Sequence, residues 1–260
     1  MKVKQIVVGL MLLSITATSW AADNSIYIDQ SGDNSTITMT QDGTGNRIRG
    51  LSGAGTSNTT PANIYGDNVT VTVEQIGSGN TLKLGIDTGT ASGGVDSSVS
   101  YKLTGSNATA EISMNGAGTS TSLSNVIDIT QTSATGSVVA VAMTGTGNNL
   151  TSVQTGGSYA NLTATISGTS NTSTVSQTGG ASNSATITQS GDYGTASITT
   201  VGASNSVTVS QSGGTSGQSA TVNLTGSSNT ASITQSGTAD HTTSITGVGS
   251  GNNFTIIQRN

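Results

Sequence analysis

The sequence contains no cysteine, one proline, one phenylalanine and one tryptophan, and only 7% of its 260 residues are charged. Without cysteine the chain has neither disulfides nor thiolate ligands, so packing and hydrogen bonding alone must stabilise its fold. It also has a single histidine, His241. A serine hydrolase would need this residue as its base, and the sequence offers no acid–base set around it. We therefore predict no catalytic residue and interpret His241 as a turn residue.

Charge of either sign is scarce, with seven Lys and Arg against 12 Asp and Glu. No basic stripe with interleaved aromatic residues forms, which argues against a nucleic-acid partner. The sequence GGVD at residues 93–96 is a lone partial match to a calcium-binding repeat, and the GTG at residues 145–147 is followed by no helix pattern that would make it a phosphate loop. We therefore predict no metal site and no cofactor.

The first 21 residues have the organisation of a secretory signal peptide. Lys2 and Lys4 precede an apolar stretch at residues 6–15, and the small residues Ser19 and Ala21 stand where a signal peptidase would look, with the cut expected after Ala21. The alternative is a membrane anchor, but a spanning helix needs about 20 apolar residues, and this stretch is shorter. We expect an exported mature chain of residues 22–260 that crosses the periplasm and has no membrane span.

What the chain does contain is a repeated seven-residue signature, Asn-x-apolar-x-apolar-x-Gln. Copies occupy residues 24–30, 125–131, 183–189, 205–211, 229–235 and 252–258, and looser copies with one serine occupy residues 148–154 and 171–177. The patterned positions lie an even number of residues apart, so in an extended strand they share one face, and Thr and Ser occupy the other. The signature therefore predicts one recurring β-strand rather than a disordered polar segment.

The spacing of the copies predicts how these strands are arranged. Successive signature glutamines lie 23 and 23 residues apart up to Gln177, and 22, 24 and 23 residues apart from Gln189 onward. Between copies lies a second strand-like arm without glutamine, as at residues 160–166, and Gly-rich turns join the arms. A period of about 23 residues is typical of stacked repeats. We predict an all-β fold, a β-solenoid with two facing, parallel, in-register sheets, over residues 22–260.

Two segments interrupt the period. Residues 50–62 contain Pro61, which cannot donate a hydrogen bond within a central strand, and residues 85–96 are rich in Gly and Ser. We expect both segments to be surface loops inserted between repeats.

The glutamines change arms once. Gln177 and Gln189 lie only 12 residues apart, so both arms of that unit carry the signature, and Gln30 and Gln41 suggest a similar doubled unit. If the arms form two sheets, a ladder of glutamines passes from one sheet to the other at this unit. Stacked amides donate to one neighbour and accept from the next, which leaves few polar atoms unpaired on burial. The predicted assembly ladder consists of Gln30, Gln41, Gln75, Gln131, Gln154, Gln177, Gln189, Gln211, Gln235, Gln258, Asn125, Asn148, Asn171, Asn183, Asn205, Asn229 and Asn252.

The ends of such a solenoid are predicted to be its reactive surfaces. The last signature copy runs to Gln258, and no helix, proline or charged cap follows it. An uncovered terminal strand exposes unpaired N–H and C=O groups, and repeat proteins that stay soluble normally carry capping repeats. We expect the terminal strands to accept another copy of the chain.

Several stretches follow the order Gln-x-Gly-x-x-Asn, at residues 41–46 and 75–80 and, one residue longer, at residues 177–183. With the aliphatic residues that lead to the next glutamine, they resemble the curlin repeat of curli amyloid subunits over most of residues 24–258. The resemblance implies export through an outer-membrane secretion pore, nucleation by a nucleator subunit, and self-assembly into cell-surface fibres of the biofilm matrix. Some copies lack the glutamine, which leaves open whether the chain is a major or a minor, nucleating subunit.

A monomeric extracellular solenoid remains the alternative, as an adhesin, a phage-fibre segment or an ice-binding protein. Thr-x-Thr pairs at residues 36–38, 70–72, 163–165 and 186–188 would place hydroxyls on an outer face, where regular rows can order water. The pairs are spread over both arms and alternate with serine, so we expect no long array. This alternative predicts a soluble particle without seeded growth.

Overall fold

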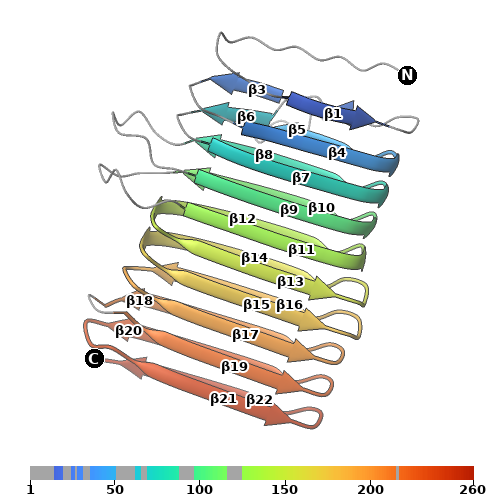
Figure 1. Cartoon of the computed structure of the whole chain (residues 1–260). Helices are drawn as coiled ribbons and strands as arrows, with labels where there is room; N and C mark the ends of the chain where they lie inside the picture. The colour runs from blue at the N-terminus through green and yellow to red at the C-terminus, as the bar shows by residue number, and fades with distance from the viewer. Residues whose placement is uncertain are drawn as a thin grey trace.

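The computed structural model describes residues 15–19, 25–26, 28–31, 36–50, 62–65, 69–87, 97–115, 125–214 and 217–260. All helices and strands assigned in these ranges are β-strands, 22 in total, and every pair of neighbouring strands is parallel. They form two stacked sheets in which the strands follow chain order (Figure 1). The described residues contain no helix that could cross a membrane.

The odd-numbered and even-numbered strands belong to different sheets over most of the chain. Sheet A contains, in spatial order, β1 (Ile15–Ser19), β4 (Thr36–Thr44), β7 (Val69–Ser78), β9 (Ser97–Ser106), β11 (Asn125–Thr135), β13 (Asn149–Thr155), β15 (Thr172–Thr178), β17 (Thr195–Val201), β19 (Ser219–Thr225) and β21 (Thr242–Val248). Sheet B contains β2 (Ser25–Ile26), β5 (Arg47–Gly50), β8 (Thr81–Asp87), β10 (Thr109–Asn115), β12 (Val138–Thr146), β14 (Asn161–Thr169), β16 (Ser184–Ser190), β18 (Ser206–Gly213), β20 (Thr230–Gly237) and β22 (Asn253–Arg259), with β3 (Ile28–Ser31) and β6 (Ala62–Tyr65) beside this path. Each sheet A strand and the sheet B strand that follows it form one turn of the solenoid, which we call a rung.

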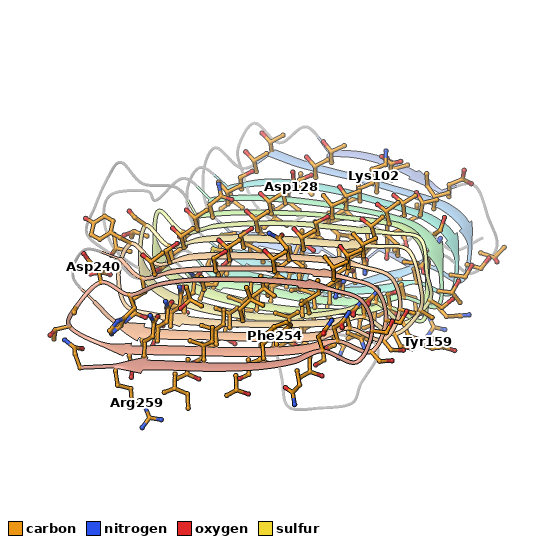
Figure 2. The ribbon with its side chains drawn as sticks, turned by 90° about the horizontal axis from the view of Figure 1, so that it is seen from below. Lys102, Asp128, Tyr159, Asp240, Phe254 and Arg259 are labelled. Carbon is orange, nitrogen blue, oxygen red and sulfur yellow. The ribbon has the colours of Figure 1, made fainter. Side chains whose placement is uncertain are left out.

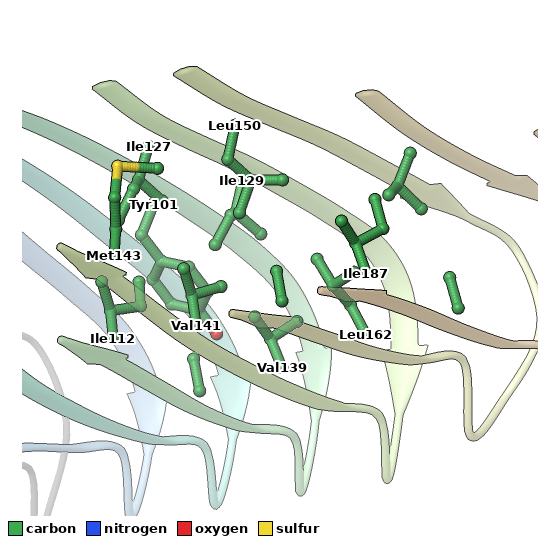
Figure 3. Packing of buried hydrophobic residues seen from close by; sticks show 14 of the residues in the cluster. Tyr101, Ile112, Ile127, Ile129, Val139, Val141, Met143, Leu150, Leu162 and Ile187 are labelled. Carbon is green, nitrogen blue, oxygen red and sulfur yellow. The ribbon is translucent and has the colours of Figure 1, made fainter. Parts of the chain in front are cut away.

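Alternation along each strand produces the core. In β16 the side chains of Ala185, Ile187 and Gln189 are buried, while the residues between them are exposed or half-buried. Because neighbouring strands are in register, residues of like character stack in columns, as Ala185, Val207 and Ala231 do. The aliphatic columns of the two sheets meet in a continuous core (Figure 3). The predicted fold, an all-β solenoid with facing parallel sheets, is confirmed.

The predicted loops differ from the structure at their boundaries. Strand β8 continues to Asp87, so residues 85–87 are strand rather than loop. Gly50 ends β5 and Ala62 begins β6, so the two ends of the first predicted loop are strand rather than loop. The residues between these boundaries, 51–61 and 88–96, lie outside the described ranges. Alternation of two residue types does not show where a strand ends, since Gly85 can continue the pairing with Ser113.

The predicted signal peptide is described only in part. Residues 1–14 lie outside the described ranges, whereas Ile15–Ser19 form β1 at the edge of sheet A. Cleavage after Ala21 remains a prediction from the sequence. If it occurs, it removes β1 and leaves β4 as the edge strand.

Candidate functional site: amide ladders and strand edges

A ladder of glutamine amides runs along the carboxyl-terminal half of sheet B. The Nε2 of Gln189 donates to the Oε1 of Gln211 at 2.9 Å, Gln211 donates to Gln235 at 2.8 Å, and Gln235 donates to Gln258 at 2.9 Å. An amide nitrogen carries two protons, and Gln211 uses the second on the backbone carbonyl of Thr195 in the facing sheet, at 2.9 Å. The ladder thus binds strand to strand along the stack and sheet to sheet across it.

A second glutamine ladder lies in sheet A. Gln131 donates to Gln154 at 2.6 Å, and Gln154 donates to Gln177 at 2.5 Å. The hydroxyl of Tyr101 donates to the Oε1 of Gln131 at 3.3 Å and so ends this ladder. Burial raises the pKa of Tyr101, because the phenolate would lose its hydration, so the hydroxyl keeps its proton.

Leu103 separates this ladder from an amino-terminal pair. It occupies the register position between Gln75 and Gln131 in sheet A. The Nε2 of Gln75 donates to the Oε1 of Gln41 at 3.3 Å. Sheet A therefore holds two separate glutamine ladders within the described residues.

The glutamines change sheets where the spacing predicts. In sheet A the position of Gln177 is taken in the next strands by Thr200, Leu224 and Gly247. In sheet B the strand before Gln189 carries Ile166 at this position. The Oε1 of Gln189 accepts a hydrogen bond from the Ser173 hydroxyl at 2.6 Å, which starts the new ladder. Where the old ladder ends, the Nε2 of Gln177 and the Oγ1 of Thr200 are buried without a partner among the described atoms.

The signature asparagines tie each rung to the following one. The backbone N–H of Asn205 donates to the Oδ1 of Asn183 at 3.0 Å, and the Nδ2 of Asn183 donates to the carbonyl of Gly202, in the next turn, at 2.7 Å. Asn205 makes the same two contacts with Asn229 and Gly226. The predicted positions with this bonding pattern are Asn125, Asn148, Asn183, Asn205 and Asn229; Asn171 accepts from the N–H of Gly194 instead, and Asn252 stands in the last rung.

Two members of the asparagine columns, Asn46 and Asn80, are missing from the predicted ladder. Both are buried, and the backbone N–H of Asn80 donates to the Oδ1 of Asn46 at 3.1 Å. A search for Asn followed by Gln six residues later cannot find them, because Ile86 follows Asn80 at that distance. The signal that identifies them is the Gly-x-x-Asn turn, which they share with Asn205 and Asn229.

Gln30 does not join the other glutamines. Its Cα partner in β6 is Ile64. The register positions between Gln30 and Gln189 are occupied by Ile64, Ile86, Met114, Met143 and Ile166. The doubled unit at Gln30 and Gln41 therefore places one glutamine in each sheet, but only Gln41 has a glutamine beside it in the described structure.

At the carboxyl-terminal end of the stack, β21 and β22 each have a partner strand on one side only within the described residues. Gln258 is half-buried there, and its Oε1 accepts from Gln235 and from the Thr243 hydroxyl at 2.6 Å. The Phe254 ring lies between the sheets in the space that Gly247 leaves free (Figure 2). Val248 is 76% exposed and Ile257 is 55% exposed. This edge thus combines open backbone, ladder amides and apolar side chains.

Among the residues that the structure describes, the polar groups outside the ladders form no second site. His241 is half-buried, and its Nε2 lies 3.3 Å from the carbonyl oxygen of Ser236. The ion pairs Lys83–Glu111 and Lys102–Glu74 lie on the outer faces at 3.9 and 3.5 Å, where such pairs contribute little. No group of three His, Asp or Glu side chains that could hold a metal occurs in the described ranges.

Comparison with known proteins points to the same repeat. A search of curated proteins finds no match to the sequence. Residues 180–213 match the family model of the curlin associated repeat. The matched segment contains β16, β17 and β18, and with them two signature copies that carry ladder residues of sheet B. The family to which this repeat belongs is structural rather than enzymatic. In this segment the chain is therefore similar to the curlin associated repeat, which supports its resemblance to the curli amyloid subunits.

Proposed function

We propose that the chain is exported and self-assembles into curli-like amyloid fibres of the extracellular matrix, which serve adhesion and biofilm formation. The observation that carries this proposal is the in-register stack, whose backbone and amide ladders continue to the open edge of β21 and β22. A second copy that stacks there repeats the pairing that every interior strand already makes. The curlin-like repeat at residues 180–213 supports the same function.

The ladder asparagines and glutamines are the residues that we propose to guide assembly. At the open edge, the backbone N–H and the Nδ2 of Asn252 both donate to the Oδ1 of Asn229, as in interior asparagines, and the Oδ1 of Asn252 has no following rung among the described residues. Gln258 stands at the same point of its own ladder. The curlin resemblance implies two further partners, a nucleator subunit at the cell surface and an outer-membrane secretion pore. Fibre growth of the purified chain, without any other subunit, distinguishes a major subunit from a minor, nucleating one.

The first test is seeded growth of the purified mature chain, residues 22–260. We expect fibres that bind an amyloid dye to form after a lag, and sonicated fibres to abolish the lag, because seeds supply ready strand edges. Dye fluorescence and electron microscopy check this result. A chain that stays monomeric for days at tens of micromolar, with or without seeds, would contradict the proposal. Growth only on added seeds of another subunit would show that the chain depends on a nucleator and is not itself the nucleating subunit.

The second test removes the terminal amides. Replacing Gln235 and Gln258 with alanine should slow elongation on wild-type seeds by about tenfold, since the last rungs of each chain then lose the amide hydrogen bonds, of about 0.5–1.5 kcal/mol each, that order β20 and β22 for docking. The control is His241→Ala, which leaves the ladder intact and should elongate at the wild-type rate. Equal rates for the double variant and the wild type would remove the ladder from the assembly mechanism.

One observation favours the alternative of a monomeric water-ordering solenoid. The strand register places Thr163 and Thr165 beside Thr186 and Thr188, so the Thr-x-Thr pairs form compact arrays rather than being scattered. The pairs at residues 36–38 and 70–72 are neighbours in the same way. Ser210 follows Thr188 in its row, and Ser98 and Ser100 follow Thr70 and Thr72, which keeps each all-threonine array small. A soluble monomer that inhibits ice recrystallisation and is not seeded by its own fibres would support this alternative.

A further inference from the structure

Strand β1 repeats the sequence of the strand that it pairs with. β1 reads ITATS, and the partner residues in β4, Ile37 to Gln41, read ITMTQ, so three of the five paired positions are identical. The pairing is parallel and in register, like that of the interior strands. Yet Ile15–Ser19 lie within the stretch whose sequence predicts a signal peptide cut after Ala21. The leader thus ends in a segment with the sequence and the pairing of a solenoid strand.

Cleavage at this point would divide a rung. β1 is the sheet A half of the first rung, and β2 and β3 are its sheet B half. Removing residues 1–21 takes the first half and leaves the second. The outer edge of β4 then exposes the N–H and C=O groups that β1 had paired.

We propose that β1 is a removable edge strand, which occupies the edge of β4 while the leader is attached, and that this edge receives β21 of a second copy once the leader is cut. The proposal rests on the proposed function. We expect β21 to pair with β4 because continuing the sheet A register places Ile245 where β1 has Ala17, and Gly247 where β1 has Ser19. Both strands thus bring a small residue to the register position of Gln41, and threonine, Thr18 or Thr246, to the register position of Thr40.

This junction has a consequence in sheet B. β22 belongs to the same rung as β21, so when β21 pairs with β4, β22 must take the place of β2 and β3 on β5 and β6. The half-rung is held by short strands, with two register pairs between β2 and β5 and four between β3 and β6. β22 offers a continuous strand of seven residues. We therefore expect the remaining half-rung to be displaced at each junction between copies.

The test compares three chains on seeds made from residues 22–260. They are the mature chain, the full chain 1–260, and the full chain with Thr16→Pro and Ala17→Pro. Two adjacent prolines cover both directions in which the strand's N–H groups point, so one of them removes a donor facing β4, while the apolar part of the leader stays intact. We expect the full chain to elongate seeds at least about tenfold more slowly than the mature chain, because every junction needs a free β4 edge. The double proline variant should recover most of the mature rate.

A mixing experiment tests whether the full chain blocks a fibre tip against further growth. The full chain can add through its own β21 and β22 to the amino-terminal tip of a fibre, and it then blocks that tip. At amounts equal to the seeds, it should reduce the elongation of mature chain by about half, with the proline variant as the control. Full-chain elongation within twofold of the mature rate would overturn this inference alone, and so would a proline variant as slow as the full chain. Failure of the mature chain to elongate would overturn the proposed function and this inference with it.

Discussion

Replacing Gly202 with alanine is expected to destabilise the carboxyl-terminal rungs by about 3–5 kcal/mol, from backbone strain and overpacking together. Gly202 has a φ of +111°, which L-residues rarely adopt, and a Cβ there would lie 2.1 Å from the carbonyl oxygen of Gly226 in the next rung. That oxygen belongs to the backbone and is the acceptor for the Asn205 amide. Neither turn can therefore move away without breaking the asparagine column.

Gly179→Ala is the matched control for this substitution. Gly179 also has positive φ, at +67°, but no atom lies within 4 Å of the position of its Cβ. It should cost only the left-handed conformation, about 1–2 kcal/mol. Urea midpoints at low protein concentration, with hydrogen exchange of the amides in β17–β22, measure both variants. Equal losses for the two would show that backbone conformation, and not contact between stacked turns, makes these glycines necessary.

The sequence predicts which residues form the strands better than it predicts which residues stack beside one another in neighbouring strands. Alternation places Ala185, Ile187 and Gln189 on one face, and the 12-residue step from Gln177 to Gln189 locates the transfer between sheets. These features depend on spacing within a strand or between neighbouring strands. The isolated position of Gln30 does not, because it depends on which residues the intervening rungs bring to its column.

The turns and the leader show what spacing cannot reveal. The positive φ of Gly202 and its contact with the next turn follow from stacking, and Asn80 is recognised only through the same turn. Tyr101 looks like an ordinary strand residue until the structure places its hydroxyl at the end of a ladder. The match between β1 and β4 is present in the sequence, but a leader is normally removed from fold analysis before such matches are sought.

Gln211→Ala is expected to destabilise the stack by about 3–5 kcal/mol, since it opens a cavity and leaves buried amide atoms of two neighbours unpaired. The neighbours are Gln189, which donates to Gln211, and Gln235, which accepts from it. Asn223→Ala, on the exposed face of β19, is the control and should change the urea midpoint little. Losses of similar size in the two variants would mean that the ladder bonds add nothing measurable.

Replacing the whole sheet B ladder separates stability from register. The same column in earlier rungs is filled by Met114 and Met143, so four Gln→Met changes at positions 189, 211, 235 and 258 should fit. Combined with Ser173→Ala and Thr243→Val, they remove both partners of each side-chain bond, which is nearly neutral. We expect this variant to recover to within about 2 kcal/mol of the wild type, whereas Gln211→Ala alone does not. Methionine side chains do not distinguish one neighbour from another, however, so the variant should elongate wild-type seeds at least about tenfold more slowly. A methionine variant that elongates at the wild-type rate would reduce the amide ladder to core filling. Slow growth on wild-type seeds despite a stable fold would assign to the glutamines the selection of an in-register partner.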